Sequence, residues 1–286
     1  MSLPAYCTKE TVALFIGRPS AYFTASTTPT ATQIEEWLER KTAEIEARTN
    51  RAWLPRNAHL EYHSIPYNRV LMQVYSFKRF KRVYLRHGGV KTLDSTLGDS
   101  LEVFDGSTWY DWLANKTEGR SQDYWVEPED GYLFLNAQPS REGARISYRY
   151  NEGADTLLDD ATGVNTTDAT FTVDSTTGFP DVGYFLIDSE NVYYSAKTAT
   201  TFTGCTRGAR GTTAASHADN APIYFVPDRV SNLCAKMVCL ELIQGDDYSV
   251  LFPEGSSNVP LATKRSTWLN EVERELQQLQ RVVLPT

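Results

Sequence analysis

The sequence predicts an α+β fold, in which helices from the two ends of the chain form one bundle that carries two inserted antiparallel β modules. Apolar residues recur with helical spacing over the first 50 residues and again after Pro227. Between these stretches the chain breaks into short, aromatic-rich or alternating runs separated by glycine, proline and aspartate turn signals. We therefore expect helices at both ends and β structure between them.

The N-terminal region, residues 1–56, is predicted to contribute two helices to the bundle. A short helix begins after Thr8, a suitable N-cap, and ends at Gly17. The pattern Thr32-Gln33-Ile34-Glu35 is a capping box, and it predicts a longer helix that reaches about Asn50. The apolar stripe of this helix consists of Ile34, Trp37, Leu38 and Ile45.

Residues 57–152 are predicted to form a first β module and residues 166–226 a second, smaller one. The clearest hairpin joins Tyr124–Val126 to Tyr132–Leu135 through a Pro- and Gly-containing turn. The loop 151–167, rich in Thr, Asp and Gly, is predicted as the boundary between the modules. A module of about 60 residues is small for independent stability, so we expect the host domain to support the second one.

Residues 227–286 are predicted to complete the bundle with two helices. The first begins at Pro227, ends at Gly245 and has a broad apolar face, which predicts burial. In the last helix apolar residues are spaced three, four, three and four apart, a seam typical of helix pairing. We expect this seam to be an interface with another helix or another subunit; its residues are Trp268, Leu269, Val272, Leu276, Leu279 and Val283.

The composition is that of a packed globular protein, with 286 residues of which 41% are hydrophobic, 22% charged and 12% aromatic. No apolar run approaches the roughly 20 residues of a membrane span, so no membrane partner is expected. The N-terminus lacks a basic start followed by an apolar run, which predicts synthesis in a cytoplasm without a secretory signal. Four cysteines are too few for a disulfide scaffold.

The net charge of −8 is unevenly distributed. Residues 69–91 hold seven bases and no acid, whereas residues 94–165 hold 15 acids and 5 bases. Aromatic residues interleave the basic run. They either stack on single-stranded nucleic acid or face a core while the cations face water or an acidic neighbour. We favour a charged contact between subunits because the rest of the chain repels phosphates, and we assign it to Lys78, Arg79, Lys81 and Arg82.

No catalytic residue, cofactor site or metal site is predicted. Glu127, Glu129 and Asp130 cluster at a turn, where charged residues are common, and paired-carboxylate catalysis requires one acid in an apolar pocket. A buried carboxylate within residues 94–165 would contradict this prediction. His59 and His63 alternate with an acid on a wet strand face, and the glycine-rich segment 204–211 lacks the lysine of a phosphate-binding loop.

Two sets of residues carry a resemblance to known families. Ile45, Thr49, Arg51 and Trp53 match an "I-x-x-x-T-x-R-x-W"-like segment after an acidic amphipathic helix, and this opening resembles head-tail adaptor (connector) proteins of tailed bacteriophages. The later β region is similar to a small β domain that recurs in phage virion proteins. Its matching residues are Phe179-Pro180, Leu186 to Glu190, Tyr194, Thr203 to Gly208, Gly211 to Ala214 and His217.

The resemblance implies a non-enzymatic virion protein of the neck, between capsid and tail. Its subunits would form a homo-oligomeric ring, usually of twelve, that docks on the portal protein and surrounds the DNA channel. Tail, stopper or fibre proteins would bind the β modules, and double-stranded DNA would pass without sequence-specific contact. An acidic ring would repel phosphates and let the genome slide.

Two other classes of protein stay open at this point. One is a tail or fibre-network protein whose β modules bind host-surface glycan, with Trp109, Tyr110 and Trp112 as candidate stacking residues. The other is a carbohydrate-active enzyme that uses carboxylates of the acidic β region.

Overall fold

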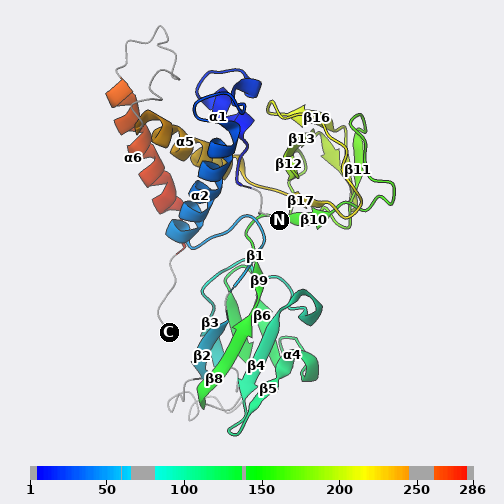
Figure 1. Cartoon of the computed structure of the whole chain (residues 1–286). Coiled ribbons are helices and arrows are strands. Elements are labelled where there is room, and N and C mark those ends of the chain that lie inside the picture. The colour runs from blue at the N-terminus through cyan, green and yellow to red at the C-terminus, as the bar shows by residue number, and fades with distance from the viewer. Residues whose placement is uncertain (1–4, 59, 66–80, 137–139, 245–260, 282–286) are drawn as a thin grey trace. The chain divides into compact units, whose positions relative to one another are not determined.

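The computed structural model describes residues 5–58, 60–65, 81–136, 140–244 and 261–281 and divides the chain into two compact units. Unit 1 comprises residues 1–49 and 153–280, and unit 2 comprises residues 50–152 and 281–286. The chain leaves unit 1 after Thr49 and returns to it at Gly153 (Figure 1). Unit 2 is therefore mainly an insertion within unit 1.

The predicted fold class, a helical bundle with inserted β modules, is wrong, because the protein is β-rich. The described residues form 17 strands in five sheets and only five helices. Helical periodicity over 17 to 19 residues is a strong signal, whereas strands of two to eight residues leave weak ones. The prediction from the sequence pattern therefore overestimated the contribution of the helices to the fold.

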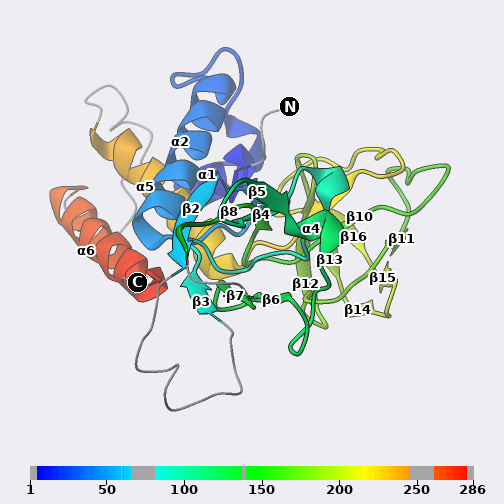
Figure 2. The same ribbon diagram turned by 90° about the horizontal axis from the view of Figure 1, so that it is seen from below.

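Unit 1 contains a helical layer in which α2, α5 and α6 pack against one another and α1 packs on α2 and α5 (Figures 1 and 2). Ile34, Leu38 and Ile45 form the buried stripe of α2. Arg48 of α2 forms an ion pair with Glu273 of α6 at 2.5 Å. The elements of this layer are α1 (Lys9–Phe15), η1 (Ser20–Tyr22), α2 (Ala31–Thr49), α5 (Asp228–Gln244) and α6 (Leu261–Leu279).

The caps of the two N-terminal helices are local features of the sequence. Thr8 caps α1 as predicted, because its side chain accepts the N–H of Thr11. In α2 the capping box lies two residues before the predicted one. The Thr30 hydroxyl accepts the N–H of Gln33 at 3.3 Å, and the Gln33 side-chain oxygen accepts the N–H of Thr30 at 2.9 Å.

The rest of unit 1 is a small β domain, residues 154–226. A five-stranded sheet, β10-β17-β12-β13-β16, and a three-stranded sheet, β11-β15-β14, enclose an aromatic core. Strand β10 lies inside the loop that was predicted as a boundary. The strands are β10 (Asp155–Leu157), β11 (Thr170–Thr172), β12 (Gly183–Ile187), β13 (Glu190–Tyr194), β14 (Ala196–Lys197), β15 (Thr201–Thr203), β16 (Thr206–Ala209) and β17 (Pro222–Tyr224).

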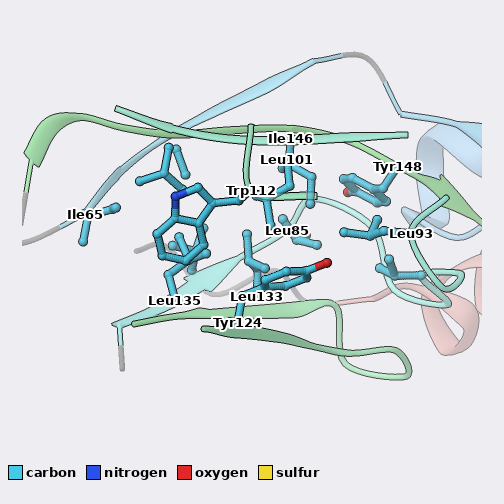
Figure 3. Close-up of a cluster of buried hydrophobic side chains, with 14 of the residues drawn as sticks. Ile65, Leu85, Leu93, Leu101, Trp112, Tyr124, Leu133, Leu135, Ile146 and Tyr148 are labelled. Carbon is cyan, nitrogen blue, oxygen red and sulfur yellow. The ribbon is translucent and has the colours of Figure 1, made fainter. Parts of the chain in front are cut away.

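Unit 2 is a sandwich of a four-stranded sheet, β2-β8-β4-β5, and a three-stranded sheet, β3-β7-β6. Figure 3 shows the largely aliphatic core between the sheets. The predicted hairpin is confirmed as β6 and β7. The elements are β1 (Arg56–Asn57), β2 (Glu61–Ile65), β3 (Lys81–Tyr84), η2 (Ser95–Leu97), β4 (Ser100–Phe104), β5 (Trp109–Asp111), α4 (Trp112–Asn115), β6 (Tyr124–Glu127), β7 (Tyr132–Leu135), β8 (Ser140–Ser147) and β9 (Arg149–Tyr150).

Candidate assembly surfaces

The apolar seam predicted on the last helix divides into buried and exposed positions. Val272, Leu276 and Leu279 are 3%, 2% and 8% exposed, because they pack into the helical layer of their own chain. Leu269 is 45% exposed, and Val283 lies outside the described residues. Among the seam residues that the structure describes, those of the N-terminal part offer apolar surface to a partner.

Trp268, the first residue of the seam, connects that exposed part to α1. Its ring meets the ring of Phe15 edge to face, with centroids 5.6 Å apart. Leu14 in the same helix as Phe15 is 50% exposed. Helix α1 therefore contributes to the surface beside Leu269 that a partner would contact.

The basic residues predicted to contact a neighbouring subunit are only partly described. Lys78 and Arg79 lie outside the described residues, and Lys81 is described only by its backbone pairing with Leu135 in β7. Arg82 is exposed on β3, and its guanidinium lies over the rings of Tyr84 and Tyr132, at 4.8 and 5.0 Å from the centroids.

For Tyr84, this arrangement differs from the interpretation in which the aromatic residues of the basic run face a core. Tyr84 lies on the outer face of the sheet beside Arg82, while Val83 and Leu85 fill the core positions. Tyr84, an aromatic residue of the basic run, thus lies on the same face of the strand as the cationic Arg82. The other three aromatic residues of the run, Tyr75, Phe77 and Phe80, lie outside the described residues.

We name the outer surface of the three-stranded sheet the arginine–aromatic face; it consists of Arg82, Tyr84, Trp125, Tyr132 and Phe134. Antiparallel pairing sets Phe134 beside both Arg82 and Trp125, and Tyr132 beside Tyr84. The rings of Trp125 and Phe134 stack at 4.0 Å with an interplanar angle of 9°. Aromatic residues and arginine are the types enriched in protein interfaces and their hot spots.

The four-stranded sheet has a second aromatic outer surface. The ring of Trp109 meets those of Phe104 and Tyr62, with centroids at 5.5 and 6.2 Å, and the Arg145 guanidinium lies 4.6 Å from it. Glu102 holds Arg145 by two hydrogen bonds, of 2.5 and 2.8 Å. Tyr62 is 64% exposed. We name this surface, residues 62, 102, 104, 109 and 145, the tyrosine–tryptophan face.

The three candidate glycan-stacking residues therefore occupy different environments. Trp112, in α4, is part of the core of unit 2 (Figure 3). Tyr110 is 42% exposed, and Trp109 is partly covered by Arg145. Only Tyr110 and Trp109 are thus placed where a sugar can reach them.

A buried charge network centres on Glu190 in the small β domain. The carboxylate accepts two hydrogen bonds from the Arg207 guanidinium, both at 2.8 Å, and further ones from the N–H groups of Gly208 and Ala215. One ring nitrogen of His217 lies 2.9 Å from Glu190, and the other lies 2.6 Å from Asp188. Both ring nitrogens of His217 therefore lie against carboxylate oxygens.

The network fixes the protonation state of Glu190. Burial alone raises the pKa of a carboxyl group. Here the hydrogen bonds from Arg207, Ala215, His217 and Gly208 outweigh burial and lower the pKa of Glu190 to about 2. The motif residues behind the resemblance to a virion β domain thus form a clamp, which fastens the glycine-rich segment to the β12–β13 hairpin.

The carboxylates of the acidic β region have structural partners. Asp99 is a buried carboxylate within residues 94–165, so the observation named as counting against the prediction of no catalytic residue is present. Its carboxylate accepts hydrogen bonds from the backbone N–H of Asp94 and from the backbone and guanidinium of Arg149. Glu129 and Asp130 are exposed at the predicted turn, and Glu127 pairs with Arg120 at 2.9 Å. These carboxylates are not grouped around a shared pocket in the part of the chain that the structure describes.

Metal ligands are likewise not gathered in the described residues, which contain no group of three or more His, Cys, Asp or Glu able to hold a metal ion. His63 contacts Glu61 at 3.0 Å, and His59 lies outside the described residues. Among the described helices, none is long and apolar enough to cross a membrane.

No protein-family model matches the sequence, and no curated protein matches it significantly. The chemistry of its surfaces therefore has to carry the argument about function. The two outer aromatic faces were not predicted from the sequence. Strands 81–84 and 132–135 contain their Arg82, Tyr84, Tyr132 and Phe134, but the inward side of a strand as apolar as Tyr132-Leu133-Phe134-Leu135 cannot be assigned from alternation.

Proposed function

We propose that this protein is a structural component of a virion neck, an adaptor whose ring of subunits joins the portal vertex to the tail and surrounds the DNA channel. The function is binding and sealing. The proposed ring has twelve copies, and its partners are the portal protein on one side and tail, stopper or fibre proteins on the other.

The placement of aromatic residues in unit 2 is the observation that carries this proposal. The core of the sandwich is largely aliphatic, while its two outer faces hold aromatic side chains beside Arg82 and Arg145. A subunit of a ring contacts two neighbours and at least one further protein, so it requires several interface patches. Aromatic residues and arginine supply most of the binding energy in such patches.

The adaptor-like segment at the end of α2 is consistent with the same proposal. Ile45 and Thr49 are buried, and the Thr49 hydroxyl donates to the Ile45 carbonyl at 2.7 Å. Trp53 is 5% exposed. These residues build the last turn of α2 and the start of unit 2.

Electron microscopy of the protein mixed with the portal protein of the same virus tests the proposal. We expect a ring stacked on the portal around a shared channel. A Leu269→Glu variant should weaken this complex, because Leu269 is the exposed residue of the helical seam. Truncation after Arg265 is a poorer test, since it also removes Val272, Leu276 and Leu279 from the core. Failure of the wild-type chain to bind the portal contradicts the proposal.

The tyrosine–tryptophan face favours one alternative, a tail or fibre-network protein that binds host-surface glycan. Exposed rings such as Tyr62 and Tyr110 are of the kind that stacks on sugars. Under this alternative, Tyr62→Ala and Tyr110→Ala abolish binding to host glycans and Leu269→Glu has no effect on it. Under the adaptor proposal the chain binds portal and shows no glycan affinity.

A further inference from the structure

A groove of about 630 Å³ lies within unit 1, between the helical layer and the small β domain. Helices α1 and α2 form one wall, and the turn after β12 and strand β17 form the other. Leu38, Leu186 and Tyr224, which are 2%, 6% and 9% exposed, supply apolar surface to its lining. The volume is within the usual range for binding pockets, roughly 300–1,000 Å³.

The ionisable residues that line the groove are mostly acidic: Glu10, Glu35, Glu39 and Asp188 against the single base Lys9. Lys9 is engaged by Glu35 at 2.5 Å, and Asp188 by His217. Glu39 is exposed. The groove therefore combines an apolar floor with a net negative charge, a combination that suits a segment bearing both apolar and basic side chains.

Contacts between the helical layer and the small β domain hold the two walls of the groove together. Arg210 of the turn after β16 forms an ion pair with Asp228 of α5 at 2.5 Å and lies over the ring of Tyr184 at 3.9 Å. A Cβ added at Gly211 would lie 2.4 Å from the Cβ of Ser20, so the two parts approach closely there. The groove is thus a feature of a packed unit.

We propose that this groove binds residues 69–80 of a neighbouring copy of the chain, and this inference rests on the proposed ring. The segment carries Arg69, Lys78 and Arg79 and no acid, so its charge is opposite to that of the groove. Phe77 and Phe80 flank the Lys-Arg pair and offer apolar side chains for the floor. The basic run and the groove thereby become the two halves of one contact.

Ring geometry favours a neighbouring copy as the source of this segment. In a ring of identical subunits, each contact joins one patch on a subunit to a different patch on the next. Such head-to-tail contacts need two complementary surfaces on one chain. An acidic groove in unit 1 and a basic segment in unit 2 meet that requirement.

The first experiment measures binding of a fluorescently labelled peptide of residues 69–80 to the full chain at low ionic strength. We expect saturable binding that Glu10→Lys/Glu39→Lys weakens about tenfold or more, because both acids line the groove. The matched control is Glu36→Lys/Asp174→Lys, which changes the charge equally at exposed residues outside the groove lining and should bind normally.

Four results overturn the inference: no binding to the wild-type chain, equal loss in the control variant, unchanged binding in the groove variant, and equal binding of a scrambled peptide. A Lys78→Glu/Arg79→Glu chain serves as a second receptor. If the peptide binds this chain and not the wild type, the groove is filled by the segment of its own copy, and the assignment to a neighbour is wrong.

The second experiment mixes the groove variant with the Lys78→Glu/Arg79→Glu variant and follows ring formation on the portal. Each variant alone should fail, because its groove and segments carry charge of the same sign. Equal amounts of both should restore rings, since each groove then meets a segment of opposite charge. Normal rings from either variant alone overturn the inference but leave the adaptor proposal intact. If the wild-type chain forms no ring, the adaptor proposal fails, and the peptide result still stands on its own.

Discussion

Most aromatic residues of the small β domain lie in its core, whereas unit 2 keeps Trp112, Tyr124 and Tyr148 in its core and places many others on the outer faces of its sheets. In the small β domain, Phe171, Phe179, Phe185, Tyr194 and Phe202 lie in the core. In unit 2 the core is built mainly from Leu, Ile, Val and Ala, while Tyr62, Trp109, Trp125 and Phe134 lie on the outer faces.

Under the proposed function, this difference separates a scaffold from a binding module. Aromatic rings inside the small β domain pack against one another, as Phe202 does with Tyr194 at 4.7 Å, and stabilise the fold. Aromatic rings on the outer faces of unit 2 contribute less to its core, and under the proposed function they contact other proteins. Substitutions in the two regions should consequently affect different properties, stability in the first and assembly in the second.

The largest effect is expected from Phe202→Ala in the small β domain. This fully buried ring contacts Phe179 and Phe185 at 5.0 and 4.9 Å, so its loss should lower the free energy of unfolding by about 3–5 kcal/mol. The matched change on the outer face of unit 2, Phe134→Ala, should cost only about 1 kcal/mol. Urea denaturation measures both, and equal losses would break the comparison.

The next effect concerns the Glu190 clamp. Glu190→Gln leaves Arg207 without a charged partner and should destabilise the small β domain by about 3 kcal/mol. The folded-state pKa of about 2 lies below the ordinary 4.5, so the unfolded chain binds more protons between these values. The stability from the clamp is therefore present above pH 4.5 and lost as pH falls toward 2.

Hydrogen exchange of residues 183–217 as a function of pH checks this prediction. The Glu190→Gln variant should lack the acid-dependent loss in this window, because its side-chain amide does not titrate there. An equally steep acid loss in the variant would show that other groups control it.

Unit 2 should respond to acid in a different window, through His87. Burial, with Arg86 and Arg281 nearby, lowers the pKa of His87 from 6.5 to about 4, against the opposing charge of Glu61. The unfolded chain takes up a proton first, so the stability of unit 2 should fall as pH drops from 6.5 to 4. His87→Phe keeps a ring against Tyr150, which His87 stacks on at 4.0 Å, and should remove this dependence.

Four of the six tryptophans, at positions 53, 109, 112 and 125, lie in unit 2, whereas Trp37 and Trp268 lie in unit 1, so tryptophan fluorescence reports mainly on unit 2. If the free energy of unfolding falls equally in wild type and in His87→Phe between pH 6.5 and pH 4, the assigned role of His87 is excluded.

The smallest effect on stability is expected from Tyr62→Ala. With 64% of its surface exposed, Tyr62 should contribute within about 0.5 kcal/mol to the free energy of unfolding. The melting temperature should barely move, whereas binding of tail, stopper or fibre proteins should fall if the tyrosine–tryptophan face is an interface. A variant that unfolds readily would instead place Tyr62 among the structural residues.

Local features of the structure could be predicted where one interaction fixes them. Thr8 caps α1, and turn residues between two apolar runs specify the β6–β7 hairpin. The fold class was wrong because strands such as β10, with only Asp155, Thr156 and Leu157, owe their existence to pairing with β17. Pairing partners distant in the sequence leave no local pattern.

The candidate surfaces were harder to predict for a related reason. The heptad-like spacing of Val272, Leu276 and Leu279 identifies a packing face, but it cannot say whether the partner is another chain or the same one. The groove is lined by Glu39 and Asp188, which are about 150 residues apart in the sequence, so no local pattern predicts that they lie together. For the Glu190 clamp, the sequence shows only the motif residues. The hydrogen bonds that join them are seen only in the structure.

The discontinuity of unit 1 sets an order for folding during synthesis. Residues 50–152 are contiguous and can fold as soon as they leave the ribosome, whereas α2 must wait for α5. Thr42 lies against Cys234, and at synthesis rates of roughly 5–20 residues per second that partner emerges some 10–40 s later. Until then, Ile34, Leu38 and Ile45 lack the apolar surface that buries them in the finished protein. The nascent helix is thus a natural binding site for chaperones, and its exposure ends when α5 arrives.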